Sequence, residues 1–198
     1  MIEKNFVKQG ILEAQLEEYL RKKFEKAGYS WSDLQRTPLG LRIIVFAHKP
    51  GLVVGRSGKK IQQIADEISK KFGVDNPLLD VREIENPYLD AEIVARRIAK
   101  ALERGINYKK VCNFYLSKVM EQGAVGVRIR VGGKLAGKER SRFQKFKEGF
   151  LIHSGEYSNV LVQEGYAQAS IKPGIVGVHV KIMKKTPKEF EFEKKREA

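Results

Sequence analysis

Residues 53–63 read VVGRSGKKIQQ, where Gly55 and Gly58 enclose an arginine and a serine. An apolar segment precedes this stretch, and Lys59 and Lys60 open a segment with helical periodicity. Two glycines at this spacing suit three arrangements. The loop could cradle the phosphates of a nucleotide, let a polynucleotide backbone approach closely, or form a plain corner between two helices.

A nucleotide-binding loop of the Walker type is excluded by register. That motif needs a glycine five positions before the glycine of its Gly-Lys pair, and a serine or threonine directly after the lysine. Gly58 and Lys59 supply the pair, but the flanking positions hold Val53 and Lys60. The hydroxyl that would bind magnesium is missing, so the sequence predicts no ATP-hydrolysing activity.

The segments around the loop favour close approach of a nucleic-acid backbone. Apolar spacing predicts a helix over 8–27, a strand and turn over 29–40, a central strand over 41–48, a short helix over 51–54, a helix over 59–72 and a strand over 78–84. A G-x-x-G turn between two helices after a central strand is typical of a KH domain, and the preceding helix and strand indicate type II. The predicted RNA-binding loop is Gly55, Arg56, Ser57, Gly58, Lys59 and Lys60.

The charge balance points to the same class of partner. The chain has 38 lysines and arginines against 24 aspartates and glutamates, a formal charge of +14. Such an excess predicts a polyanionic partner, nucleic acid rather than a membrane, because no apolar run approaches the roughly 20 residues that span a bilayer. The single cysteine, Cys112, excludes an internal disulfide and a multi-cysteine zinc site, and we expect a buried thiol in a reducing cytoplasm.

The second half has a different pattern. ENPYLD at 85–90 marks a boundary, where Pro87 interrupts any helix and Asp90 can cap the next one. Helices are predicted over 90–104 and 107–122, followed from Val125 by period-two strands of an antiparallel sheet. We therefore expect an α+β protein with a KH domain over 1–86, a second domain over 87–184 and a charged, mobile tail over 185–198.

Two basic regions lie in the second domain. On the helix over 107–122, Lys109, Lys110 and Asn113 share a polar sector, which by itself is an ordinary solvated face. The stretch from Arg128 to Lys147 holds eight basic residues and one acidic residue, a density that favours phosphate contact. The predicted RNA contacts there are Arg128, Arg130, Lys134, Lys138, Arg140, Arg142 and Lys145. Phe143 and Phe146 could stack on bases, although alternating aromatics more often belong to a core.

The sequence gives little support for a catalytic or metal-binding site. His48, His153 and His179 are scattered without metal-ligand spacing. The carboxylates near the domain boundary straddle a strand, a proline turn and a helix start, which suits a solvated hinge better than a magnesium site. They are Asp80, Glu83, Glu85, Asp90 and Glu92. We predict no catalytic residue, no metal, no cofactor and no small-molecule substrate.

Three segments resemble one family closely. AHKPGLVVGRSGKKIQQIADEISKKFG, MEQGAVGVRIRVGGKLAG and LIHSGE, in this order and spacing, are similar to the universal third protein of the small ribosomal subunit. The opening segment GILEAQLEEYLRKKFEKAGYS and the short C-terminal extension are more similar to its archaeal form. The resemblance covers about residues 4–184.

The resemblance implies a type II KH domain followed by two helices on a four-stranded, mainly antiparallel sheet. It implies a structural constituent of the small-subunit head that binds ribosomal RNA, contacts neighbouring head proteins and lines the mRNA entry channel in the cytoplasm. In bacterial relatives, basic residues on a helix of the second domain contact messenger and help to unwind it. Lys109 and Lys110 match two of these positions, and Asn113 matches a third that is basic in bacteria.

Two other function classes remain as alternatives. A free KH-domain regulator or RNA chaperone would bind RNA outside the ribosome, although it would not need a second basic domain of this kind. A nuclease or helicase would need a phosphate loop, a metal site or an acid–base group that the sequence does not supply. Complete co-sedimentation with small subunits would favour the ribosomal interpretation over the regulator.

Overall fold

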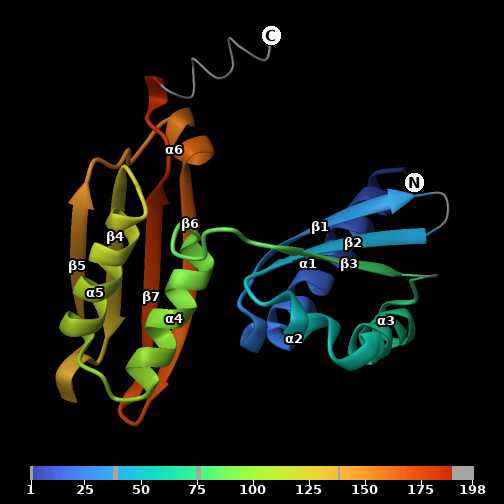
Figure 1. The fold of residues 1–198 in the computed structure, drawn as a ribbon, viewed down its shortest axis with the longest axis horizontal. Helices are drawn as coiled ribbons and strands as arrows, with labels where there is room; N and C mark the ends of the chain where they lie inside the picture. Colours follow the sequence, from blue (N-terminus) through green and yellow to red (C-terminus); the bar gives the residue numbers. More distant parts are fainter. Residues whose placement is uncertain (1, 38–39, 75–76, 138, 189–198) are drawn as a thin grey trace. The chain divides into compact units, whose positions relative to one another are not determined.

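A computed structural model describes residues 2–37, 40–74, 77–137 and 139–188 of the chain (Figure 1). The chain divides into two compact units, Met1–Glu85 and Asn86–Ala198. Lys138 and most of the charged tail predicted over 185–198 lie outside the described residues.

The first unit follows the predicted order of elements. Its helices and strands are α1 (Ile2–Lys23), β1 (Tyr29–Thr37), β2 (Gly40–Ala47), α2 (Pro50–Val54), α3 (Lys59–Phe72) and β3 (Leu78–Glu83), with short 3-10 helices at Glu25–Ala27 and Arg56–Gly58. The boundaries predicted for α1 were wrong at both ends. The helix starts near the beginning of the chain, where no apolar stripe faces the core, and its last turn tightens before Gly28 (φ 73°), whose N–H donates to the Glu25 carbonyl.

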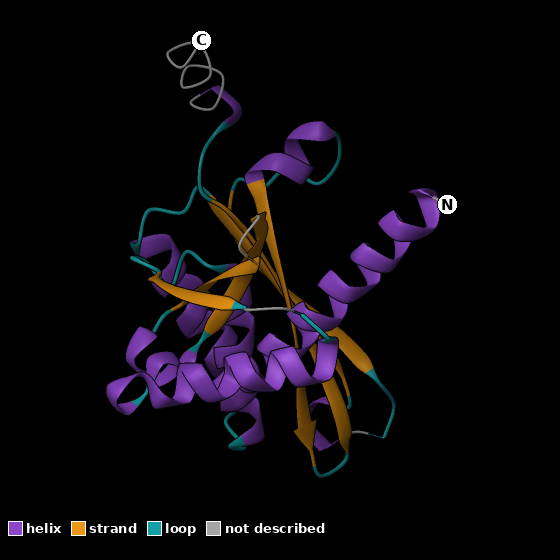
Figure 2. Ribbon diagram, turned by 90° about the vertical axis from the view of Figure 1, so that its right-hand side faces the viewer, coloured by secondary structure: helices purple, strands orange, loops and turns teal. Residues whose placement is uncertain are grey.

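The three strands form a mixed sheet in the order β1-β2-β3. Strand β2 is central as predicted, antiparallel to β1 and parallel to β3. The core joins this sheet to α1 and α3, and Figure 2 shows α1 as the long helix that ends at the N-terminus. Its largest fully buried side chains include Leu16, Leu20, Phe24, Tyr29, Ile43 and Ile68. A mixed sheet with helices packed against it therefore confirms the predicted α+β class for this unit.

The second unit contains α4 (Ala91–Glu103), α5 (Tyr108–Glu121), β4 (Gly126–Gly133), β5 (Arg142–Gly149), α6 (Glu156–Leu161), β6 (Val162–Ile171) and β7 (Gly174–Met183). Asp90 caps α4 as predicted, because its side chain accepts hydrogen bonds from the N–H groups of Glu92 and Ile93. The short helix α6 was not predicted. Six residues are too few for apolar periodicity to reveal a helix.

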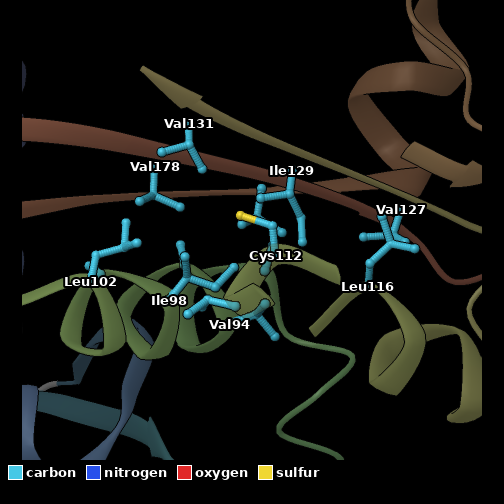
Figure 3. Close-up of a cluster of buried hydrophobic side chains, with 14 of the residues drawn as sticks. Val94, Ile98, Leu102, Cys112, Leu116, Val127, Ile129, Val131 and Val178 are labelled. Atoms are coloured by element: carbon cyan, nitrogen blue, oxygen red, sulfur yellow. The ribbon is translucent and has the colours of Figure 1, made fainter. Parts of the chain in front are cut away.

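The four strands form an antiparallel sheet in the order β5-β4-β7-β6, with α4 and α5 on one face. Side chains from both helices interlock with alternate strand residues, as Figure 3 shows for Ile98, Cys112 and Ile129. Cys112 is fully buried as predicted, and burial raises the pKa of its thiol to about 12. Together the two units confirm the predicted α+β class.

Candidate nucleic-acid interface

The loop between α2 and α3 holds two glycines for different reasons. Gly55 (φ 74°) and Gly58 (φ 72°) both adopt backbone conformations that other residues avoid. A β-carbon on Gly55 would lie 2.6 Å from the β-carbon of Lys60, whereas one on Gly58 would meet nothing within 4 Å. Gly55 therefore serves internal packing, whereas Gly58 leaves open space beside the loop.

The basic side chains of this loop also differ in their contacts. Arg56 and Lys59 are exposed. No side chain caps the first turn of α3, but the Lys59 N–H already donates to the Arg56 carbonyl, so the two exposed cations are the groups that can meet a phosphate. The Lys60 ammonium instead donates to the Leu52 carbonyl at 2.6 Å and stabilises the end of α2. For Ser57 the structure describes the backbone, which lies within the 3-10 turn Arg56–Gly58.

Helix α5 has two faces, as its spacing predicted. Val111, Cys112 and Val119 are buried, and the opposite sector exposes a polar set: Lys109, Lys110, Asn113 and Ser117. Asn107 starts the helix by accepting the N–H of Lys109 at 3.0 Å. The sequence reasoning missed Phe114, whose side chain is 53% exposed beside this polar sector.

The predicted contacts between Arg128 and Lys147 divide into two groups. Arg130 pairs with Lys145, and Arg128 pairs with Lys147, across β4 and β5. Since alternate strand residues point to opposite faces and Ile129 is buried against the helices, Arg128 and Arg130 face away from them. The other predicted contacts that the structure describes are exposed in or beside the β4–β5 connection: Lys134, Arg140 and Arg142.

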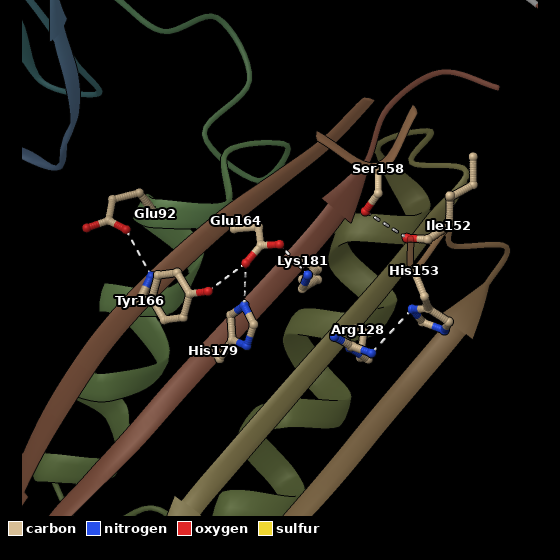
Figure 4. Close-up of polar contacts among 9 residues, drawn as sticks. All are labelled: Glu92, Arg128, Ile152, His153, Ser158, Glu164, Tyr166, His179 and Lys181. Carbon is tan, nitrogen blue, oxygen red and sulfur yellow. Dashed lines mark hydrogen bonds and ion pairs between the residues drawn. The ribbon is translucent and has the colours of Figure 1, made fainter. Parts of the chain in front are cut away.

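Strands β6 and β7 add polar side chains to this outward face that the sequence reasoning did not assign to the site. Glu164 accepts hydrogen bonds from the Tyr166 hydroxyl (2.6 Å) and the Lys181 ammonium, and its carboxylate lies 3.0 Å from the Nε2 of His179 (Figure 4). Burial alone would raise the pKa of Glu164, but these hydrogen bonds outweigh it and lower that pKa to about 2. Period-two alternation in VHVKIM was the signal that could have identified His179 and Lys181.

Glu164→Gln is expected to make stability less dependent on pH. The folded-state pKa of Glu164, about 2, lies below its ordinary value of 4.5, so the carboxylate stabilises the fold above pH 4.5 and loses this effect as pH falls toward 2. Allowing for solvent screening, the variant should lose about 1 kcal/mol at pH 7. Urea unfolding at pH 7, 4.5 and 3 measures the difference, which should shrink at each step; a constant difference would contradict the assignment.

The structure gives the carboxylates near the domain boundary separate structural contacts. Asp80 accepts from the Nε of Arg42 at 2.7 Å, Asp90 caps α4, and Glu92 accepts from Arg96 at 2.9 Å. Within the described ranges, no group of three histidine, cysteine, aspartate or glutamate side chains could hold a metal ion. Every helix in these ranges is too short or too polar to span a lipid bilayer.

Both units match known protein families. Residues 15–89 match the KH domain family, and residues 98–182 match the family described as ribosomal protein S3, C-terminal domain. Small ribosomal subunit protein uS3 of Methanocaldococcus jannaschii is 45% identical over 184 residues, which cover 93% of this chain and 88% of that protein. The uS3 proteins of Methanococcus aeolicus (48% identical, 92% and 88% covered) and Methanocorpusculum labreanum (44%, 96% and 84%) are similar over nearly the same extent.

These relatives come from archaea, and the two matched families follow one another in the order that the sequence motifs predicted. The predicted resemblance is therefore confirmed: the chain belongs to the uS3 family of small ribosomal subunit proteins.

Proposed function

We propose that helix α5 presents Lys109, Lys110 and Asn113 to messenger RNA at the mRNA entry channel of the small ribosomal subunit. The broader role follows from family membership. The chain is a structural, non-enzymatic constituent of the small subunit that binds ribosomal RNA beside other ribosomal proteins.

The two-faced character of α5 carries the proposal. Its apolar side is buried in the core of the second unit, which holds the helix rigidly, while both lysines remain exposed next to one another. Exposed lysines on a fixed helix can contact phosphates without reading base sequence, as a protein that meets every messenger requires. Asn113 adds a neutral hydrogen-bonding group one turn further along.

In the same proposal the KH loop and the β4–β5 region contact ribosomal RNA. Arg56 and Lys59 beside the open space at Gly58 supply one cationic site, and Arg128, Arg130 and Lys145 supply another. Both sites suit phosphate binding because their cations are exposed or half-exposed.

Lys109→Ala with Lys110→Ala is expected to slow translation only where messenger is structured. Loss of about two phosphate contacts should reduce the salt slope of single-stranded RNA binding by about 1.4, at about 0.7 per contact. Small subunits reconstituted with the variant should handle unstructured messengers normally and should pause at a hairpin just downstream of the start codon. Toeprinting with matched messengers, with and without the hairpin, measures this difference.

A matched control removes the same charge elsewhere in the second unit. Lys172 and Lys184 are exposed outside α5, so Lys172→Ala with Lys184→Ala should leave hairpin passage unchanged. Asn113→Lys should speed passage, because it adds a third cation to the same face. Equal defects of the Lys109 and Lys110 variant on both messengers would show a role in assembly and contradict the entry-channel assignment.

A further inference from the structure

The sheet of the second unit has one face that α4 and α5 do not cover. We call its central part the open sheet face and define it by twelve outward residues: Phe143, Lys145 and Lys147 of β5, Arg128, Arg130 and Gly132 of β4, Gly177, His179 and Lys181 of β7, and Glu164, Tyr166 and Gln168 of β6. Strand register aligns them in three rows across the sheet. On the two central strands, β4 and β7, buried valines and isoleucines alternate with them on the helix side.

Two aromatic rings stand on the opposite edge strands of this face. Phe143 is 60% exposed, with the guanidinium carbon of Arg130 at 4.9 Å and the Lys145 ammonium at 5.7 Å from its ring centroid. Tyr166 is 54% exposed and stacks on His179, with ring centroids 4.2 Å apart and an interplanar angle of 13° (Figure 4). The edge strands are separated by three strand spacings, about 14 Å.

The row that contains Phe143 is flat between its two edges. Gly132 pairs with Phe143 on one side and Gly177 on the other, so no side chain rises above the sheet at these two positions. If Phe143 belonged to a hydrophobic core, other side chains would cover its ring. Phe146, one position from an outward residue, does pack against the hydrophobic core, which leaves Phe143 as the exposed ring of the pair.

The charges of the open sheet face suit a polyanion. Among the described residues, Arg128, Arg130, Lys145 and Lys147 form no ion pair, although the Arg128 guanidinium lies 3.3 Å from the Nδ1 of His153, within hydrogen-bond distance (Figure 4). Glu164 is the one carboxylate in the set that defines the face, and its hydrogen bonds to Lys181, Tyr166 and His179 already engage it. The cations therefore remain available to phosphates along the β4–β5 side.

We propose that the open sheet face binds an unpaired segment of small-subunit ribosomal RNA, with bases stacked on Phe143 and Tyr166 and phosphates held by Arg128, Arg130, Lys145 and Lys147. Exposed rings on a four-stranded sheet can stack only on bases that are splayed out of a helix, so single-stranded RNA fits and duplex does not. The proposal rests on the proposed function in one respect, that ribosomal RNA is the RNA bound.

The first test measures stacking with the full chain. A short single-stranded RNA that contains the fluorescent base 2-aminopurine is titrated with the wild type and with Phe143→Ala, Tyr166→Ala and Phe150→Ala. Stacking of the base on a protein ring should quench the fluorescence. Loss of the Phe143 ring or of the Tyr166 ring should weaken binding about tenfold. Phe150 is the matched control, since it is also 60% exposed but lies beyond the end of β5.

Salt dependence separates stacking from charge. Phe143→Ala should lower affinity while leaving the salt slope unchanged, whereas Lys145→Ala with Lys147→Ala should reduce the slope by about 1.4. The same RNA annealed into a duplex should show no loss of affinity with Phe143→Ala. Equal losses on single-stranded and duplex RNA, or no loss on either with circular dichroism unchanged, would overturn the proposal.

The second test identifies the RNA in the assembled particle. A photoreactive benzoylphenylalanine at position 143 is incorporated into reconstituted small subunits, and its crosslinks are mapped. Crosslinks to unpaired ribosomal nucleotides support the proposal, while crosslinks to added messenger or to a neighbouring protein overturn it. The result does not depend on the α5 assignment, because Lys109→Ala with Lys110→Ala should change hairpin passage without changing these crosslinks.

Discussion

Gly165→Val should prevent the second unit from folding stably. Gly165 on β6 lies against the first residues of α4. A β-carbon at this position would stand 2.2 Å from the Ala91 carbonyl oxygen and 2.5 Å from the Glu92 nitrogen. Both are backbone atoms, so the start of α4 would have to move away from the sheet. Overpacking of this kind at a fully buried contact should cost about 4 kcal/mol or more.

Thermal unfolding followed by circular dichroism at 222 nm measures this loss. Gly177→Ala is the matched control, because Gly177 also lies inside a strand of the same sheet, yet the atom nearest to a β-carbon placed there, the Gly132 carbonyl oxygen, is 3.9 Å away. The control should unfold within a few degrees of the wild type. A Gly165→Val variant that unfolds at the wild-type temperature would contradict the close approach of α4 to β6.

Arg56→Asp with Lys59→Asp should strongly weaken RNA binding through the KH loop. The pair removes two cations, each worth about fivefold in single-strand binding at 0.1 M salt, and adds two negative charges that repel RNA, so the loss should exceed roughly 25-fold. The fold should be retained, because both side chains are exposed and an acidic residue near the start of α3 is electrostatically favourable there.

Filter binding of a single-stranded RNA to the full chain measures this effect. The measurement is repeated in a Phe143→Ala background, in which the open sheet face should contribute little to RNA binding. Lys4→Asp with Lys8→Asp is the matched control: it makes the same charge change on the exposed side of α1. If both pairs weaken binding equally, net charge is responsible and the KH loop is not a specific site.

Local patterns in the sequence determined much of this architecture. The order of elements in the first unit, the central position of β2, the cap at Asp90 and the burial of Cys112 were all predicted from spacing of a few residues. The reason is that helical and strand periodicities, caps and glycine stops act within one or two turns of chain. The family resemblance extended the prediction to uS3 membership, which the comparisons confirmed.

The tertiary structure alone decided which distant side chains share a surface. Strand β7 lies between β4 and β6, and this order places His179 and Lys181 beside Arg128 and Arg130, about fifty residues earlier in the chain. Likewise, packing joined Lys60 to the Leu52 carbonyl and left Phe143 exposed. Local periodicity predicts which residues share a face of one strand. The pairing of strands and their register depend instead on the packing of the whole unit. For this reason the open sheet face could be recognised only from the fold.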